Sequence, residues 1–171
     1  LDDAKGVKPL AGPEARTIFL GFDQLRDELL YSNIKGKNPF KDLRVRQAFI
    51  KAINIDAIKK KVMRGASVPA GLMVAPQING FNSALNDRPS YDPKGAKKLL
   101  ADAGYPDGFE VTMDCPNNRY VNDERICQAS ASMLAKIGIK VNLLAQPKSK
   151  YFGKVLAQNN YDTSFFLLGW T

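Results

Sequence analysis

The chain has 171 residues, of which 44% are hydrophobic and 25% are charged, proportions that predict one folded domain and exclude disordered, collagen-like and coiled-coil proteins. The formal net charge of +8 raises the question of nucleic acid as a partner. No recognition-helix, RNA-recognition or zinc-finger pattern accompanies that charge, so we expect a solvated basic surface and no nucleic acid.

The first elements are a strand and two helices. Residues 15–22, ARTIFLGF, are β-branched and aromatic and follow a Gly-Pro turn signal, which predicts a strand. Asp42 can cap a helix in which apolar residues recur at spacings of three and four. Asp56 is expected to cap a second helix that ends at Gly65. The apolar positions of the first helix are Val45, Ala48, Phe49, Ala52 and Ile53.

A long segment without a lasting period separates these helices from the next one. Residues 66–91 carry Pro and Gly at intervals, which predicts an irregular segment. A loop of this length usually serves a function or covers a surface. A compact helix is predicted after it, with Asp92 as its cap, Pro93 at its first position and Gly104 as its stop signal.

Strands and helices alternate in the rest of the chain. This order predicts an α/β fold, in which a mixed or parallel sheet with βαβ crossovers is flanked by helices. Ligands of such sheets bind beyond the carboxyl ends of the strands, which here are residues 115–122 and 169–171. The predicted strands are 108–115, 139–145 and 162–170, the predicted helices are 122–137 and 148–159, and the first of these helices is expected to bury Ile126, Ala129, Met133, Leu134 and Ile137.

Arg119 is the main candidate binding residue. It lies in the loop after a predicted strand and before a helix, where we expect backbone N–H groups without partners. A guanidinium beside free amides suits a carboxylate, because its planar fork can make two hydrogen bonds to one carboxylate. A solvated loop arginine is the alternative.

The two cysteines, Cys115 and Cys127, bracket this loop. In an oxidising compartment we expect a disulfide between them, worth roughly 3 kcal/mol through its constraint on the unfolded chain. Two buried thiols in a reducing compartment are the alternative. The absence of any CxxC spacing argues against a zinc site, and we expect no metal and no cofactor.

Trp170 is the only tryptophan, and Gly169 before it permits close approach of another segment to the backbone. The indole could line a ligand pocket or pack in the core. Asp123 and Glu124 are interpreted as helix-start charges. The chain contains no histidine, which excludes histidine general bases, and no nucleophile-elbow pattern, so we expect no enzymatic activity.

Four ordered motifs resemble a known family. They are NPFKDLRVRQAFIKAINIDAI, YDPKGAKKLLADAGYPDGFEV, LAKIGIKVNL and YDTSFFLLGWT, and they lie within residues 15–171. In this order they resemble the C-terminal lobe of the family 5 extracellular solute-binding proteins, which are the peptide, dipeptide and nickel-type receptors of bacterial ABC importers. The resemblance implies one lobe of a two-lobed, type II-like periplasmic binding protein that closes over its solute.

The resemblance also implies roles for named residues. PNNR matches a dipeptide-receptor pattern whose arginine holds the ligand carboxylate, which is Arg119 here. Asn118 and Tyr120, on either side of it, are assigned to ligand binding with it. Gly169 and Trp170 match the start of a GWxxD motif whose Asp takes the amino group of the ligand.

The expected partners are a small peptide or peptide-like solute, an inner-membrane permease and the other lobe of the receptor. Residues 1–171 are thus expected to be a single domain, a C-terminal lobe cut before its last motif ends, in the periplasm or on a lipid anchor. No stretch is long and apolar enough for a transmembrane helix, and the start lacks a signal-peptide pattern. A non-peptide solute, such as a nickel chelate, opine, haem or oligosaccharide, and a basic nucleic-acid module are the alternatives.

Overall fold

The computed structural model describes residues 6, 12, 14–157 and 161–171, and its centre is a four-stranded mixed sheet. The strand order is β1-β4-β2-β3. β1 is antiparallel to β4, while β4, β2 and β3 run parallel to one another. This arrangement confirms the predicted α/β fold with a mixed sheet. The strands are β1 (Thr17–Phe22), β2 (Phe109–Pro116), β3 (Ile139–Gln146) and β4 (Phe165–Trp170).

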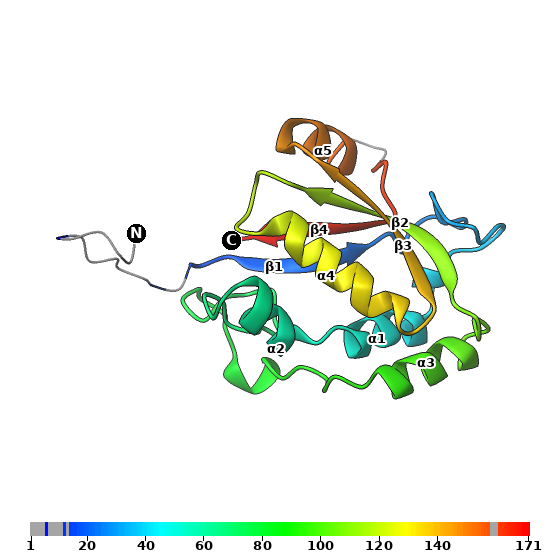
Figure 1. Cartoon of the computed structure of the whole chain (residues 1–171), viewed down its shortest axis with the longest axis horizontal. Coiled ribbons are helices and arrows are strands. Elements are labelled where there is room, and N and C mark those ends of the chain that lie inside the picture. The colour runs from blue at the N-terminus through cyan, green and yellow to red at the C-terminus, as the bar shows by residue number, and fades with distance from the viewer. Residues whose placement is uncertain (1–5, 7–11, 13, 158–160) are drawn as a thin grey trace.

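Two crossover helices cover opposite faces of this sheet. α4 (Asp123–Ala135) joins β2 to β3, and α5 (Lys148–Val155) joins β3 to β4. Neighbouring residues of a strand point to opposite faces. Cys115 of β2 is bonded to α4, whereas the adjacent Asp114 pairs with Lys154 of α5 at 2.9 Å. Figure 1 shows α5 above the strands and α1 and α3 below them.

The helices α1 (Leu43–Ala52) and α3 (Pro93–Asp102) begin as predicted. The side chain of Asp42 accepts a hydrogen bond from the Arg44 N–H and caps α1. Asp92 accepts from the Gly95 N–H in the same way, and Pro93 takes the first position of α3. Gly104 follows the helix with φ 92°, a left-handed conformation that glycine adopts without steric cost.

The second predicted helix differs in its cap and in its geometry. Its N-cap is Asn54, whose side chain accepts from the Ala57 N–H, so the expectation that Asp56 caps it was wrong. Asn54 has the extended backbone that a cap requires, while Asp56 lies inside the first turn, where a negative charge complements the helix dipole. One turn of α-helix, α2 (Ile55–Ala57), continues as the π-helix η2 (Ile58–Val62).

The core lies between the sheet and the helices α1, α3 and α4. Phe22 and Phe165 stack at 5.2 Å between ring centroids, and Phe40 and Phe49 meet edge to face beside them. Burying each such ring contributes roughly 1.5–3 kcal/mol. On α4 the fully buried residues include Cys127 and Leu134, with Ile137 just after it, whereas Ile126, Ala129 and Met133 are only partly buried.

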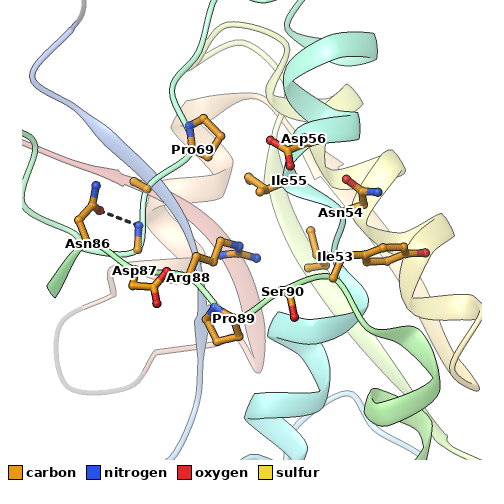
Figure 2. A pocket seen from close by; sticks show the side chains of 13 residues that line it. Ile53, Asn54, Ile55, Asp56, Pro69, Asn86, Asp87, Arg88, Pro89 and Ser90 are labelled. Carbon is orange, nitrogen blue, oxygen red and sulfur yellow. Dashed lines mark hydrogen bonds between the residues drawn. The ribbon is translucent and has the colours of Figure 1, made fainter. Parts of the chain in front are cut away.

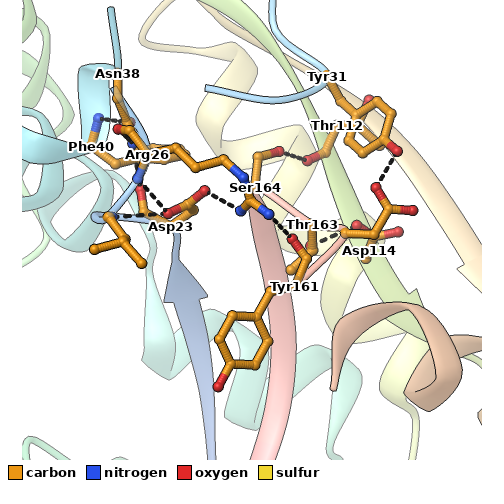
Figure 3. Close-up of polar contacts among 12 residues, drawn as sticks. Asp23, Arg26, Tyr31, Asn38, Phe40, Thr112, Asp114, Tyr161, Thr163 and Ser164 are labelled. Carbon is orange, nitrogen blue, oxygen red and sulfur yellow. Dashed lines mark hydrogen bonds and ion pairs between the residues drawn. The ribbon is translucent and has the colours of Figure 1, made fainter. Parts of the chain in front are cut away.

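A cluster of polar side chains lies at the start of β4 and links it to β2. Asp114 is fully buried and accepts hydrogen bonds from Lys154 and from the Thr163 hydroxyl, at 2.9 and 2.6 Å. Figure 3 shows the contact between Thr163 and Asp114. Beside it, the Ser164 hydroxyl donates to the Thr112 carbonyl. A buried carboxylate persists only when it is paired and hydrogen-bonded, so the cluster sets the register between β2 and β4.

The segment 66–91 is irregular, as predicted, apart from one short 3₁₀ turn at Ser83–Leu85. Asn86 ties the segment to itself by accepting hydrogen bonds from the Gly71 and Leu72 N–H groups. Within the described part of the chain, no helix has the length and apolar character needed to cross a membrane.

Candidate functional site

Three strands end at one edge of the sheet, and the candidate binding residues lie there. Because β2, β3 and β4 are parallel, their carboxyl ends share this edge. β1 is antiparallel to β4 and starts at the same edge, where Thr17 pairs with Trp170. Figure 1 shows the turn between β2 and α4 beside the end of β4 and the start of β1. The topology therefore brings Arg119, Gly169 and Trp170 to a common edge, as the sequence predicted.

The backbone of the Arg119 loop is held by a buried carboxylate. Asp123 is 4% exposed, and its Oδ2 accepts hydrogen bonds from the N–H groups of Arg119 and Tyr120, at 2.8 and 2.9 Å. Its Oδ1 accepts from the Glu124 N–H at 2.9 Å. The expectation of free amides beside Arg119 was therefore wrong, because Asp123 already takes them. The sequence analysis correctly predicted Asp123 as a charge at the start of the helix, but it did not predict these hydrogen bonds.

The predicted disulfide is present and closes the base of the same loop. Cys115 and Cys127 are bonded with their Cα atoms 6.6 Å apart, and both residues are fully buried. Cys115 is the last residue but one of β2 and Cys127 lies one turn into α4, so the bond ties the loop to two regular elements. The loop between them carries Arg119 with its backbone constrained at both ends.

Two asparagines connect this loop to β3 and α5. The Asn117 N–H donates to the carbonyl of Gln146, the last residue of β3, at 3.0 Å. Asn118 Oδ1 accepts from the Lys148 N–H at 2.7 Å, so this oxygen satisfies the first turn of α5. Asn118 was predicted to bind ligand, and the structure gives its carbonyl oxygen this structural bond.

Tyr120 connects the loop to β4. Its hydroxyl accepts a hydrogen bond from the Gly169 N–H at 2.9 Å. A Cβ on Gly169 would lie 2.8 Å from Tyr120 Cε1 and from Ile18 Cδ1, and 3.0 Å from Arg16 Cδ. Side chains from two segments thus cover this glycine, which confirms that the position serves close approach to the backbone.

Two guanidinium groups lie at the Tyr120 ring. The Cζ atom of Arg119 is 5.0 Å from the ring centroid, and that of Arg16 is 5.8 Å from it. Arg16 also pairs with Glu14 at 2.8 Å. Arg119 is exposed, and among the described residues no carboxylate pairs with its guanidinium. Sequence reasoning missed Arg16, because only the pairing of β1 with β4 brings it to this edge.

Trp170 is 60% exposed, which excludes the alternative that it packs in the core of this domain. Residues 165, 167 and 169 of β4 pair with 22, 20 and 18 of β1 on the face that carries the aromatic core. Tyr120 covers Gly169 on that same face. Because side chains alternate along a strand, the next residue, Trp170, points to the opposite face of the sheet. Its role at a ligand remains a prediction.

The structure has a shallow hollow at this edge and a separate cavity elsewhere. The hollow has a volume of about 440 Å³ and is lined by Tyr120 and by the start of α4. The second cavity, of about 250 Å³, lies between the α1–α2 junction and the segment 66–91, and Figure 2 shows it. The two share no lining residue. The hollow is lined by Asn117, Tyr120, Asn122, Asp123, Glu124, Arg125 and Gln128.

Arg88 is the cation of the second cavity. It is half-buried, and one of its N–H groups donates to the Ile50 carbonyl at 3.4 Å. Burial lowers the pKa of its guanidinium from the usual value. Asp56 and Asp87 also line this cavity, so its charges do not favour an anion. Among the residues that the structure describes, no three His, Cys, Asp or Glu side chains gather as a metal site would require.

Comparison with known proteins identifies what the chain is similar to. A family model described as "Bacterial extracellular solute-binding proteins, family 5 Middle" matches residues 1–171. The dipeptide-binding protein of Escherichia coli strain K12 is 33% identical over 138 residues, which cover 79% of this chain and 25% of that protein. The glutathione-binding protein GsiB of Escherichia coli O1:K1 / APEC is 31% identical over 173 residues, which cover 100% of this chain and 31% of that protein.

Solved structures agree with these sequence matches. The crystal structure of a dipeptide-binding protein from Pseudoalteromonas sp. SM9913 in complex with Met-Leu superposes with a TM-score of 0.75 at 26% identity. The match covers 91% of this chain and 28% of that one. The chain therefore spans between a quarter and a third of the length of these relatives.

Proposed function

Because this chain belongs to the bacterial extracellular solute-binding proteins of family 5, we propose that it is one lobe of the substrate-binding component of an ABC importer. The proposed solute is a small peptide or a peptide-like molecule, bound outside the cytoplasm when the two lobes close. The family consists of solute-binding proteins rather than enzymes, and the proposal includes no catalytic step. Its partners are the other lobe, a permease in the inner membrane and the solute itself.

One observation supports a solute with a carboxylate: an arginine without a carboxylate partner in the described part of the chain, on a loop whose backbone is held in place. Arg119 is exposed and has no carboxylate partner within the described residues, while its own backbone N–H is held by Asp123. A fixed backbone reduces the entropy that binding has to remove. The guanidinium is therefore ready to pair with a ligand carboxylate, and that pairing strengthens when closure of the lobes excludes water.

A non-peptide solute is the second candidate, because the same fold serves unrelated ligands. A free guanidinium selects for a carboxylate or another oxyanion, whatever the rest of the molecule is. We favour the peptide because the dipeptide-binding relative and the Met-Leu complex are among the similar proteins. We place the receptor in the periplasm or on a lipid anchor, as its membership of an extracellular family supports.

The test uses the receptor expressed from its complete gene, with titration calorimetry on a dipeptide and on its C-terminally amidated form. Arg119→Ala should weaken binding of the free acid about 30- to 100-fold, since a charge-assisted hydrogen bond contributes roughly 2–3 kcal/mol. The amide should lose less than about threefold. Lys97→Ala, which removes an exposed cation of α3, is the matched control. Equal weakening of acid and amide would contradict the assignment.

A further inference from the structure

We infer that the site takes a solute with two anionic groups, and that Arg16 binds the second group. The ligand class is a small dicarboxylate, such as a dipeptide with an acidic side chain. The inference rests on the proposed function, because it places the first carboxylate on Arg119. It goes further because it assigns the binding of a second anionic group to Arg16, which lies outside the loop.

The geometry brings two arginines to one aromatic ring. Arg119 Cζ lies 5.0 Å and Arg16 Cζ lies 5.8 Å from the Tyr120 ring centroid, so the two guanidinium carbons are separated by no more than the sum of these distances. The ring itself is fixed, because its hydroxyl accepts from the Gly169 N–H. A small solute whose two anionic groups span this separation would reach both guanidinium groups.

Arg16 is held at this position by the sheet. It directly precedes β1, whose first residue pairs with Trp170, and its Cδ lies beside the backbone of Gly169. Its stem therefore packs over β4 on the same face as Ile18. The guanidinium can reorient only at the end of this anchored stem, which favours a specific contact over a freely solvated charge.

The present partner of Arg16 is one that a ligand can replace. Arg16 pairs with Glu14, whose side chain is 63% exposed. An exposed ion pair contributes only about 0–1 kcal/mol, because water competes for both charges. A ligand carboxylate that is enclosed when the lobes close meets less competition from water, so it can displace Glu14.

The remaining charges of the edge are of both signs, but its two carboxylates already accept hydrogen bonds. The Asp123 carboxylate is occupied by three backbone N–H groups, and Glu124 accepts from the Gln128 side chain. Arg125 lines the hollow, and Lys148 begins α5 beside Asn118. With a net charge of +8, the domain attracts anionic solutes over a distance as well as on contact.

A ligand with one carboxylate would leave a problem on closure. It can satisfy Arg119, but then Arg16 must be enclosed with only the exposed Glu14 as its partner, or must remain partly hydrated. Enclosing an incompletely paired charge is unfavourable. A second carboxylate removes that penalty. The site should therefore bind a ligand with two carboxylates more tightly than a ligand of equal size with only one.

The experiment compares ligands that differ only in this charge. Titration calorimetry of the receptor expressed from its complete gene is performed with Ala-Glu and Ala-Gln, and with Glu-Ala and Gln-Ala. At least one glutamate peptide should bind tenfold or more tightly than its glutamine counterpart. Arg16→Gln should bring this ratio close to one. Glu14→Gln should raise the affinity for that glutamate peptide a few-fold, because it removes the competing carboxylate, and Lys97→Ala should leave the ratio unchanged.

The outcomes separate the two proposals. If the glutamine peptides bind and neither glutamate peptide binds more tightly, the dicarboxylate inference is overturned while peptide binding stands. If none of the four peptides binds, the proposed function fails and the inference fails with it. The comparison of ligands on the unmodified receptor does not depend on the folding of any variant, and a preference that survives in Arg16→Gln would overturn the role of Arg16.

Discussion

Asp123 and Arg119 are charged residues of one short stretch, and the fold uses them in opposite ways. Asp123 is buried and accepts from three backbone N–H groups, as a buried carboxylate must. Arg119 is exposed and reaches only an aromatic ring within the described residues. The first residue therefore organises the loop, and the second is left available for a partner outside this domain.

Gly169 gives a prediction at the residue scale. Gly169→Ala places a Cβ 2.8 Å from both Tyr120 and Ile18, which should lower the free energy of unfolding by about 1–3 kcal/mol. Gly153→Ala is the matched control, because a Cβ there meets nothing within 4 Å in the helix α5. That control should be neutral or slightly stabilising, since alanine favours a helix. Denaturant unfolding of both variants checks the contrast, and equal losses would contradict it.

At the scale of elements, the unit formed by β2, its loop and α4 combines several constraints. The disulfide joins the end of the strand to the helix, Asp123 closes the loop on itself, and Asn117 ties it to β3. Each bond acts on a different part of the loop, so the end of the strand and the start of the helix are tied together at several points. Such constraints would suit the proposed role of the loop, because a fixed backbone loses little entropy on binding.

Reduction of the disulfide tests this view of the unit. A reductant should lower the free energy of unfolding by about 2–4 kcal/mol, because the unfolded chain regains the entropy that the short covalent loop removes. Amide hydrogen exchange of residues 117–122 should become faster at the same time. The double variant Cys115→Ala with Cys127→Ala should not respond to reductant. A parent protein that shows two free thiols before reduction would contradict the bond.

At the scale of the whole molecule, the proposed binding surface is one edge of the sheet, and the aromatic core continues up to it through Cys115, Cys127 and Tyr120. Arg16 and Arg119 come from segments far apart in sequence and meet only because β1 and β4 are antiparallel. The hollow at this edge includes Tyr120 and the start of α4, but neither Arg16 nor Arg119 is among its lining residues. The chain spans between a quarter and a third of its relatives, and the proposed enclosure of the solute comes from the other lobe.

The folded domain should lose stability in acid. Burial raises the pKa of Asp23, but hydrogen bonds from Arg26 and from backbone amides outweigh burial and hold that pKa below its usual value. The side chain of Arg44 lowers the pKa of Asp42, and Lys140 and Asn142 lower that of Glu110. Carboxylates with a lowered pKa stabilise the folded state above the unfolded pKa of about 4, and this contribution is lost as the pH falls through the folded values.

The expected profile is flat at neutral pH and falls in acid. Because the chain has no histidine, little should titrate between pH 5 and 8. The free energy of unfolding from urea titrations should stay level over that range and decrease below about pH 4. Asp23→Asn should reduce the slope in acid. Stability that rises as the pH falls below 4 would contradict the lowered pKa values.

The local elements were largely readable from the sequence, because their signals lie within a few residues of one another. Two examples are α3, which has an Asp-Pro start and a glycine stop, and β2, in which apolar residues alternate. The four family motifs are also short stretches of sequence that can be recognised without the structure. The second helix shows the limit of such signals. Asn54 and Asp56 are both good caps, and backbone geometry selected Asn54.

The sequence by itself determined the α/β fold, the family and the pairing of the two cysteines, since these depend on local patterns and spacing; the binding role of Arg119 stays a prediction. Only the tertiary structure decided that Asp123 occupies the amides of the loop, that Trp170 is exposed and that Arg16 joins Arg119 at Tyr120. Those facts depend on which strands pair and in which register. Pairing brings together residues from distant segments, and no local pattern in either segment records its partner.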